Sequence, residues 1–296
     1  MQKLQYRCIK KEDHLHDFSP GVVLAEDLIT EETRDNITIL TMNQPRRLNG
    51  WTAAMLMALR DTLTKVNEQK QTHAIVLTGT GKYYSAGVNL SGTMRITHPK
   101  TLHETIRKSN QELFDTFLNL DKPIIVAVNG HAIGAPVTSA TLCDAIIAAD
   151  NATFSTPFSR LGITPEGCSS IHFARLMNEE NAQRMLGSEG WKPTAVEAQK
   201  VGLIDRVTAP EHLLEEAIKM AKEQLNVSPA RTFRGGSTKE ELKAVNAKES
   251  IHLANAFLSP AFLKGQMQFL WSRKKRFPAL IFASLWLTSP IWRLML

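Results

Sequence analysis

A single carboxylate, Glu166, stands between Pro165 and Gly167 where the sequence pattern predicts a junction between a loop and a helix. A carboxylate held at such a junction can act as a base. Two upstream segments, residues 83–90 and 129–137, place small residues directly after apolar runs typical of strands. Small residues there let backbone N–H groups approach a ligand closely. These three segments are therefore the candidate site.

Several common active-site signatures are missing from the sequence. The Gly-Thr-Gly-Lys run at 79–82 is followed by Tyr83 and lacks the full phosphate-loop spacing, and Tyr84 stands where a third dinucleotide-binding glycine would be. There is no Gly-x-Ser-x-Gly and no His-Glu-x-x-His. The three cysteines are odd in number, lie far apart in the sequence and include no Cys-x-x-Cys pair. This argues against a disulfide framework or zinc site and favours a reducing compartment. His14 and His16 have no further ligands nearby, so we interpret them as solvated surface residues.

The elements that must position the candidate site alternate along the chain. Apolar runs typical of buried strands occupy residues 37–42, 74–78, 124–128 and 145–149. Helical spacing of apolar residues falls between these runs, which predicts a stacked, spiral α/β core. After Glu166 the pattern is mostly helical, and the last two helices are predicted over residues 240–257 and 260–271.

The composition divides the chain into four parts. These are a polar N-terminal extension (residues 1–35), the α/β core (36–235), a helical region that forms a lid or covers a neighbouring subunit (236–276), and an apolar tail (277–296). Pro290 and Arg293 interrupt the tail before it reaches the roughly 20 residues that span a bilayer. We therefore expect the tail to pack on a subunit or to lie on a membrane surface.

The charge of the chain favours anionic partners. Its formal net charge is +6, but the basic residues are scattered apart from Arg46, Arg47 and residues 273–276. This distribution fits a small molecule with phosphate groups better than a nucleic acid. A solvated helix end is the alternative interpretation of residues 273–276. The N-terminus has no apolar run typical of a secretory signal, which argues against export by that route.

The three segments, in this order, resemble the crotonase (enoyl-CoA hydratase/isomerase) superfamily, over about residues 36–276. The resemblance implies a crotonase, or ClpP-like, spiral of ββα units followed by a C-terminal helical region. It also implies that two backbone N–H groups stabilise the thioester oxygen as it becomes negative, and the matching positions are Ala86 and Ala135. A lone Ser-Ala-Gly turn is more typical of an ordinary strand-to-helix connection, so the shared order of the segments carries the resemblance.

Two positions differ from family members that add water to a double bond. Those members carry glutamates where this chain has Thr138 and Phe158, and neither side chain exchanges a proton readily near neutral pH. Glu166 instead matches the base of the Δ3,Δ2-enoyl-CoA isomerases, and residues 156–162 and 165–170 look like the peroxisomal branch. The resemblance therefore implies isomerisation of 3-enoyl-CoA to trans-2-enoyl-CoA with Glu166 as the single acid and base.

The resemblance also implies the substrate contacts and the setting of the protein. Arg47, Lys274 and Lys275 are expected to bind the phosphates of coenzyme A. Further contacts are expected from Ser85, Gly87, Asn89, Leu90, Gly134 and Phe158. Coenzyme A is part of the substrate, so no cofactor and no metal are expected. The family implies a homotrimer or hexamer, with residues 236–276 in trimerisation, and an intracellular site, with the peroxisome favoured and the cytoplasm or mitochondrion left open.

Two other functions remain open at this stage. Hydration or dehydration of a specialised acyl-CoA in secondary metabolism would use Glu166 together with water. A non-catalytic module that binds acyl-CoA or acts as a scaffold would use the apolar tail as an interface.

The position of Glu166 contains an electrostatic conflict. A catalytic base needs a pKa near the operating pH, and apolar neighbours such as Phe158 would raise the pKa of Glu166 toward it. A helix N-terminus would stabilise the carboxylate and lower that pKa. The sequence does not decide between the two effects.

Overall fold

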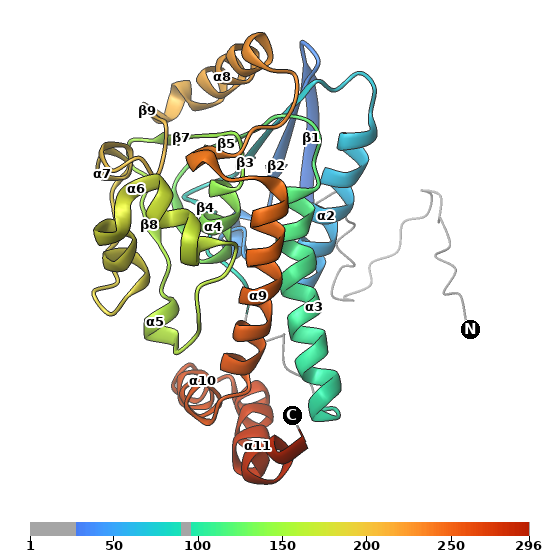
Figure 1. The fold of residues 1–296 in the computed structure, drawn as a ribbon, viewed down its shortest axis with the longest axis vertical. Helices are drawn as coiled ribbons and strands as arrows, with labels where there is room; N and C mark the ends of the chain where they lie inside the picture. The colour runs from blue at the N-terminus through green and yellow to red at the C-terminus, as the bar shows by residue number, and fades with distance from the viewer. Residues whose placement is uncertain (1–27, 90–95, 296) are drawn as a thin grey trace, which may run out of the picture.

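The computed structural model describes residues 28–89 and 96–295, and its strands form two sheets (Figure 1). The larger sheet has the order β1-β2-β3-β5-β7-β9, and its strands are β1 (Ile29–Arg34), β2 (Ile37–Met42), β3 (Ala74–Gly79), β5 (Ile124–Val128), β7 (Ala145–Ala149) and β9 (Arg206–Thr208). The smaller sheet consists of β4 (Tyr83–Ser85), β6 (His131–Ile133) and β8 (Phe154–Ser155). Only the β1–β2 pair is antiparallel among these described strands.

From β3 onward, consecutive strands alternate between the two sheets, and a helix closes each turn. The helices are α2 (Ala53–Glu68), α3 (Pro99–Leu118), α4 (Ala135–Thr141), α5 (Phe158–Leu161), α6 (Ser169–Leu186), α7 (Ala195–Lys200), α8 (Leu213–Val227), α9 (Lys239–Phe257), α10 (Pro260–Ser272) and α11 (Arg276–Trp292). Short 3-10 turns are η1 (Pro45–Arg47), η3 (Pro210–His212), η4 (Arg234–Gly236) and η5 (Arg293–Met295). This is the spiral of ββα units with C-terminal helices that the sequence predicts.

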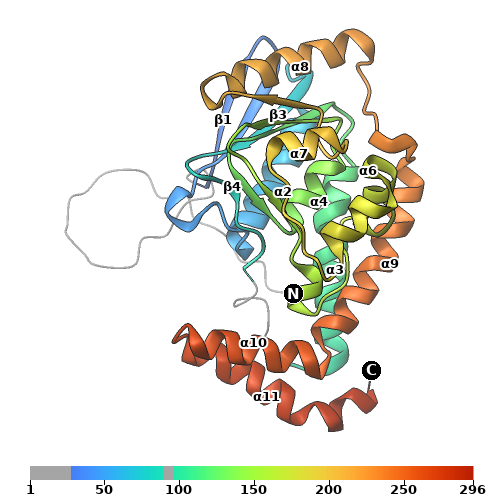
Figure 2. The same ribbon diagram turned by 90° about the vertical axis from the view of Figure 1, so that its left-hand side faces the viewer.

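The larger sheet is buried on both faces. Successive side chains of a strand point to opposite faces, so neighbouring residues enter different layers. Val76 belongs to the buried cluster that includes Ala217 of α8 on one face. Leu77 belongs to the cluster on the other face, with Leu59 of α2 and Phe117 of α3. Figure 2 shows α8 on one side of the sheet and α2, α3 and α4 on the opposite side. This two-sided burial explains the continuous apolar strands of the sequence.

The first strand corrects the expected N-terminal extension. Residues 29–34, predicted to belong to a polar extension over residues 1–35, form β1 and pair with β2. Asp35 and Asn36 make the two-residue turn between them with φ values of 50° and 62°. Asp and Asn adopt this left-handed geometry more readily than most residues, and tight hairpins require it. Because β1 is an edge strand exposed from Thr30 onward, its sequence is polar. Residues 1–27 lie outside the described part of the chain.

The C-terminal helical region contributes to the core of its own chain. Helix α9 lies along α3 (Figures 1 and 2). Asn246 of α9 is fully buried, and its Nδ2 donates to Gln111 O and to Asp115 Oδ1, each at 2.9 Å. Buried polar groups need such partners, so α9 has a defined register on α3. The contact of residues 236–276 with a neighbouring subunit stays a prediction.

The apolar tail forms helix α11, which packs on α10. Phe282 of α11 is 1% exposed and meets the ring of Phe262 edge to face, with ring centroids 6.3 Å apart. Phe277, Leu280 and Leu287 remain exposed on the same helix. None of the described helices combines the length and the apolarity needed to cross a membrane. The expected contact of the tail with a subunit or a membrane surface stays a prediction.

We expect Phe282→Ala to lower the free energy of unfolding by about 3–5 kcal/mol, because the substitution leaves a cavity in the apolar cluster between α10 and α11. Leu280→Ala, on the exposed side of the same helix, should change it by no more than about 0.5 kcal/mol. Urea unfolding followed by circular dichroism measures both. Equal effects of the two substitutions would contradict this packing.

Candidate active site

Two loops meet where the chain leaves the smaller sheet. Ser85 of β4 pairs with Ala132 of β6, and the two parallel strands end at the same edge. Gly87 then approaches the second loop so closely that a Cβ on it would lie 2.7 Å from Ile133 O. Its φ of +89° is also one that other residues rarely adopt. Glycine at this position therefore allows the two loops to come together.

The N–H groups of the first loop, residues 86–89, have different partners, and this corrects the prediction that the Ala86 N–H binds the thioester oxygen. The Ala86 N–H donates to Leu48 O at 2.9 Å, and the Gly87 N–H donates to Ser85 Oγ at 3.2 Å. Ala86 therefore has no N–H available for a substrate oxygen. The Val88 N–H has no acceptor among residues 28–89 and 96–295. Val88, which the sequence reasoning missed, is the candidate donor of this loop.

The second loop leaves the N–H of Ala135 without a described acceptor. Ala135 is the first residue of α4, and the first N–H groups of a helix have no intrahelical partner. The preceding Gly134 has φ 71° and ψ −132°, and its N–H donates to Ser155 O of β8 at 2.7 Å. The predicted contact of Gly134 with substrate is therefore not made through its N–H. Ala135 and Val88 together offer two main-chain donors on adjacent loops.

Asn49 holds the first loop in place, although the sequence reasoning gave it no such role. Its buried side chain donates from Nδ2 to Thr80 O at 2.9 Å and to Tyr83 O at 2.8 Å, and its Oδ1 accepts the Gln44 N–H at 2.8 Å. Ser85 Oγ donates to Asn49 O at 2.7 Å. Ser85 is fully buried in this network, so its side chain positions the loop, and its contact with substrate stays a prediction.

Glu166 reaches the same place from the third segment. The following residue, Gly167, packs so tightly that a Cβ on it would lie 2.6 Å from Thr138 Oγ1 and 2.5 Å from Phe114 Cε1. Thr138 lies one turn after the start of α4, so Glu166 is held near the helix that begins with a free N–H. Phe158, at the start of α5, is 2% exposed, and its expected place beside Glu166 stays a prediction.

Glu166 is only 7% exposed. Burial, and secondly the negative charge of Glu249, raise the pKa of Glu166 from its ordinary value of 4.5 to about 8. The conflict left open by the sequence is therefore decided in favour of the raised pKa. Glu249, on α9, is itself 4% exposed, and burial raises its pKa. Sequence reasoning missed this second carboxylate because it lies far downstream.

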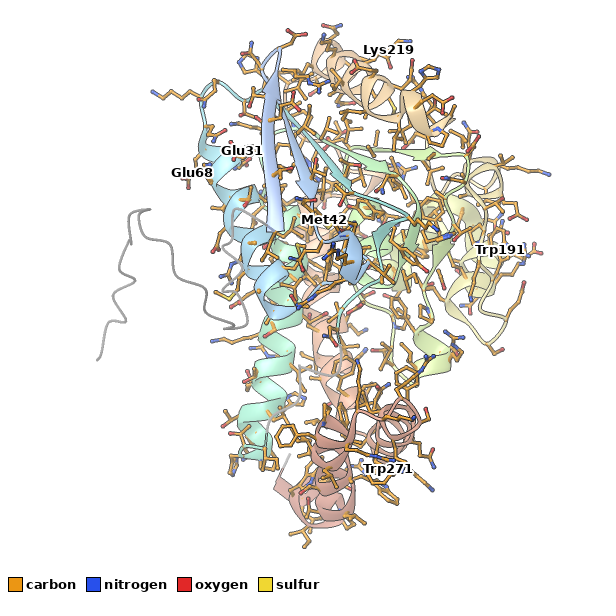
Figure 3. The ribbon with its side chains drawn as sticks, turned by 180° about the vertical axis from the view of Figure 1, so that it is seen from behind. Glu31, Met42, Glu68, Trp191, Lys219 and Trp271 are labelled. Carbon is orange, nitrogen blue, oxygen red and sulfur yellow. The ribbon has the colours of Figure 1, made fainter. Side chains whose placement is uncertain are left out.

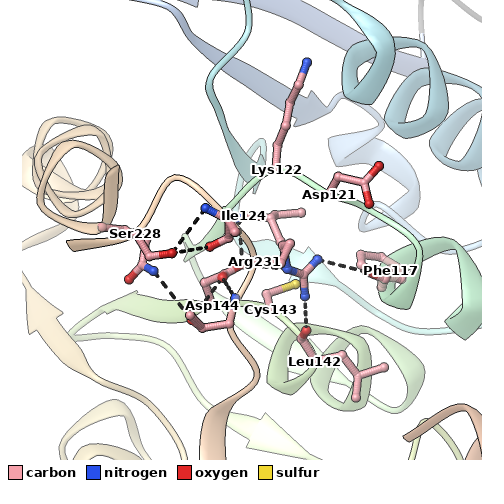
Figure 4. Close-up of polar contacts among 12 residues, drawn as sticks. Phe117, Asp121, Lys122, Ile124, Leu142, Cys143, Asp144, Ser228 and Arg231 are labelled. Atoms are coloured by element: carbon pink, nitrogen blue, oxygen red, sulfur yellow. Dashed lines mark hydrogen bonds and ion pairs between the residues drawn. The ribbon is translucent and has the colours of Figure 1, made fainter. Parts of the chain in front are cut away.

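A buried ion pair anchors the segment that leads into η4 and α9 (Figure 4). Arg231 Nε lies 2.8 Å from Asp144 Oδ2, and both side chains are buried. Arg231 also donates to Phe117 O and Leu142 O, and Asp144 accepts the Ile124 N–H at 2.9 Å. A buried charge left without its partner is costly, so this pair fixes where the segment leaves the core. Helix α9 begins a few residues after this anchored segment.

The expected phosphate-binding residues lie in two separate places. Arg47 is exposed at the end of η1, next to the loop that carries Val88. Lys274 and Lys275 are exposed at the turn between α10 and α11. No contact among the described residues joins the two groups. Figure 3 shows Trp271, near the end of α10, far from Met42, which ends β2 shortly before η1.

The remaining predicted residues are Asn89 and Leu90. Asn89 is exposed, and its N–H donates to Trp51 O at 3.0 Å, which fastens the loop to the start of α2. Leu90 lies outside the described residues. Within the described part of the chain, no cluster of three or more His, Cys, Asp or Glu side chains could hold a metal ion.

Comparisons with known proteins identify the family. The family model described as Enoyl-CoA hydratase/isomerase matches residues 32–268. A solved structure of an enoyl-CoA hydratase/isomerase from Pseudoalteromonas atlantica superposes with a TM-score of 0.70 at 26% identity, covering 83% of this chain and 97% of that one. The chain therefore belongs to the enoyl-CoA hydratase/isomerase family, and the protein is an enzyme of that family.

The relatives include both reactions named in the family title. Human enoyl-CoA delta isomerase 2 is 34% identical over 84% of this chain, which spans 64% of the human protein. Mouse peroxisomal enoyl-CoA delta isomerase 3 is 32% identical over 84% of this chain and 79% of its own length. A probable mitochondrial enoyl-CoA hydratase of Dictyostelium discoideum is also 32% identical, over 68% of this chain and 73% of its own length. The choice between the reactions therefore rests on the site.

The raised pKa of Glu166 predicts how stability depends on pH. The folded pKa lies above the unfolded one, so this carboxyl contributes stability below about pH 4.5 that is lost as the pH rises through about 8. Glu166→Gln removes the ionisation. We expect wild type and variant to unfold at similar urea concentrations near about pH 5, and the variant to be the more stable near about pH 9. Parallel pH profiles for the two proteins would contradict the buried position of Glu166.

Proposed function

We propose that the protein isomerises 3-enoyl-CoA to trans-2-enoyl-CoA, with Glu166 as the single acid and base. The observation that carries this proposal is the buried carboxyl of Glu166, with a pKa of about 8, near the first turn of α4. Thr138 and Phe158 occupy the positions where family members that add water carry glutamates. A site with one proton-transfer group suits a reaction that moves a proton without adding water.

In the proposed reaction, the Glu166 carboxylate removes a proton from C2 of the substrate. The thioester oxygen gains negative charge, and the N–H groups of Val88 and Ala135 stabilise it as fixed donors. Glu166 then returns the proton at C4, which leaves the double bond between C2 and C3. A raised pKa suits this sequence because the group must both take up a proton and give it back.

The apolar surroundings support proton return rather than hydration. Phe114 is fully buried against Gly167, the residue after Glu166, and Phe158 at the start of α5 is also buried. Excluding water protects a reactive dienolate from side reactions and strengthens the main-chain hydrogen bonds to it. The proposed site therefore favours the transfer of a single proton between two carbon atoms.

Substrate binding and assembly are part of the same proposal. Arg47, beside the Val88 loop, would bind phosphate groups of coenzyme A, with Lys274 and Lys275 as further cations. No cofactor is needed, since coenzyme A arrives with the substrate. We propose a homotrimer or hexamer, and a peroxisomal location in line with the mouse relative, with the mitochondrion as the alternative.

Hydration is the second candidate, because hydratases are among the relatives and Glu249 is a second buried carboxylate. A hydratase needs a carboxylate that activates water. Both oxygens of Glu249 already accept backbone N–H groups, from Cys168 and Ser170, which favours the isomerase. Separate incubations of a 3-enoyl-CoA and of a 2-enoyl-CoA in heavy-oxygen water distinguish the two reactions. We expect the 3-enoyl-CoA to give a 2-enoyl product of unchanged mass and the 2-enoyl-CoA to take up no label. Labelled 3-hydroxyacyl-CoA from the 2-enoyl-CoA, with the 3-enoyl-CoA left unconverted, would establish a hydratase instead.

Glu166→Gln should reduce turnover of 3-enoyl-CoA by at least about 10³-fold, because the amide can neither remove nor return the proton. Binding of the thioester should persist, since the oxyanion donors and Arg47 are unchanged. Glu179→Gln, which alters an exposed glutamate of α6, is the control and should keep full activity. Spectrophotometric turnover and calorimetric binding measure the two effects. Retained activity in Glu166→Gln would rule out the proposed base.

A further inference from the structure

Glu249 is a buried carboxylate with no direct part in the proposed proton transfer. Its Oε2 accepts the Cys168 N–H at 2.6 Å, and its Oε1 accepts the Ser170 N–H at 2.9 Å. These two N–H groups flank Ser169, the first residue of α6. The first N–H groups of a helix lack intrahelical partners and carry the positive end of its dipole. Glu249, supplied by α9, therefore covers the positive end of α6.

The turn between Glu166 and α6 has an unfavourable backbone geometry. Gly167 and Cys168 both have left-handed φ values, of 64° and 65°. A non-glycine residue keeps such a conformation only where its surroundings fix it. The N–H of Cys168 is fixed by Glu249, and its thiol, whose pKa burial raises, donates to Leu242 O at 3.1 Å. The bond from Glu249 therefore helps to hold the turn that orients Glu166.

The same contact explains the electrostatics of Glu166. A bare helix N-terminus would stabilise a nearby carboxylate and lower its pKa. Here the carboxylate of Glu249 already occupies the positive end of α6. The nearby charge that acts on Glu166 is therefore the negative charge of Glu249. The pKa of Glu166 is raised to about 8, mainly by burial and secondly by Glu249.

Other titratable groups around this position do not offset that charge. On α3, Asp115 accepts a hydrogen bond from Asn246 of α9. On α6, burial lowers the pKa of His172 to about 4, so it is neutral near pH 7. Arg175, also on α6, is paired with Glu241 at 2.6 Å and is therefore already balanced. Helix α4 has no titratable side chain.

We propose that Glu249 is the positioning residue of Glu166, because it holds the turn that carries Glu166 and screens Glu166 from the positive end of α6. This inference rests on the proposed function, in which Glu166 is the base. It assigns to α9 a role in the chemistry of its own subunit.

The test is Glu249→Gln, which keeps a carbonyl acceptor but removes the charge. We expect the midpoint of the pH dependence of kcat/KM to fall by about one pH unit, since a like charge is lost and the helix N-terminus is uncovered. Glu240→Gln removes an exposed charge from the same helix and should leave the midpoint unchanged. Glu249→Asp keeps the charge and should leave it near that of wild type. A folded Glu249→Gln protein with an unshifted midpoint would overturn the proposal.

A second measurement needs neither activity nor a folded Glu249→Gln protein. Infrared titration follows the protonated carboxyl groups of wild type and of Glu166→Gln directly. Glu249 acts as a like charge only if it ionises before Glu166, so Glu166→Gln should lose the upper titration step, near about pH 8, and keep the lower step in place. A variant that loses the lower step and keeps the upper one would overturn the proposal, because Glu249 would then be uncharged while Glu166 titrates. Absence of isomerase activity in wild type would refute the proposed function and leave this titration to decide on Glu249.

Discussion

A carboxyl group buried beside a second carboxylate is the constraint on which the arrangement of this site depends. Glu166 needs an apolar position to hold a proton near neutral pH, yet the chain delivers it to the start of a helix. Glu249 resolves this conflict by accepting the N–H groups that flank the first residue of α6. That contact requires α9 to lie across the core, where the buried pair of Arg231 and Asp144 fixes the segment that leads to it.

The main-chain donors depend on a different constraint, the parallel pairing of the short strands β4 and β6. Their common edge places two loops side by side, and each loop leaves one N–H without a described acceptor, at Val88 and at Ala135. Asn49 bonds Thr80 O and Tyr83 O, and the N–H groups of Ala86 and Asn89 donate to Leu48 O and Trp51 O, so the first loop is fixed before substrate arrives. Fixed donors do not reorganise as charge develops, which is the main source of their catalytic effect.

The sequence predicts those features that depend on local patterns. Alternating apolar strands and helices predict the spiral α/β core, the resemblance to the family adds its ββα units, and Glu166 is conspicuous in its segment. The sequence does not predict features that depend on distant contacts. Only the three-dimensional structure shows that the Ala86 N–H donates to Leu48 O while the Val88 N–H has no described acceptor. Glu249 is one charged residue among many on a helix until α9 is placed against α6. Likewise, strand β1 is exposed from Thr30 onward and therefore polar, so its sequence lacks the apolar pattern that predicts a strand.

The central claim is that one group both removes and returns the proton. It is tested most directly with a 3-enoyl-CoA carrying deuterium at C2, converted in ordinary water and analysed by mass spectrometry and NMR. A buried single base protects the abstracted deuteron from exchange, so we expect part of the label at C4 of the 2-enoyl product. If, in a single turnover, the hydrogen added at C4 came entirely from solvent, the result would contradict a single buried base and point to two separate proton-transfer groups.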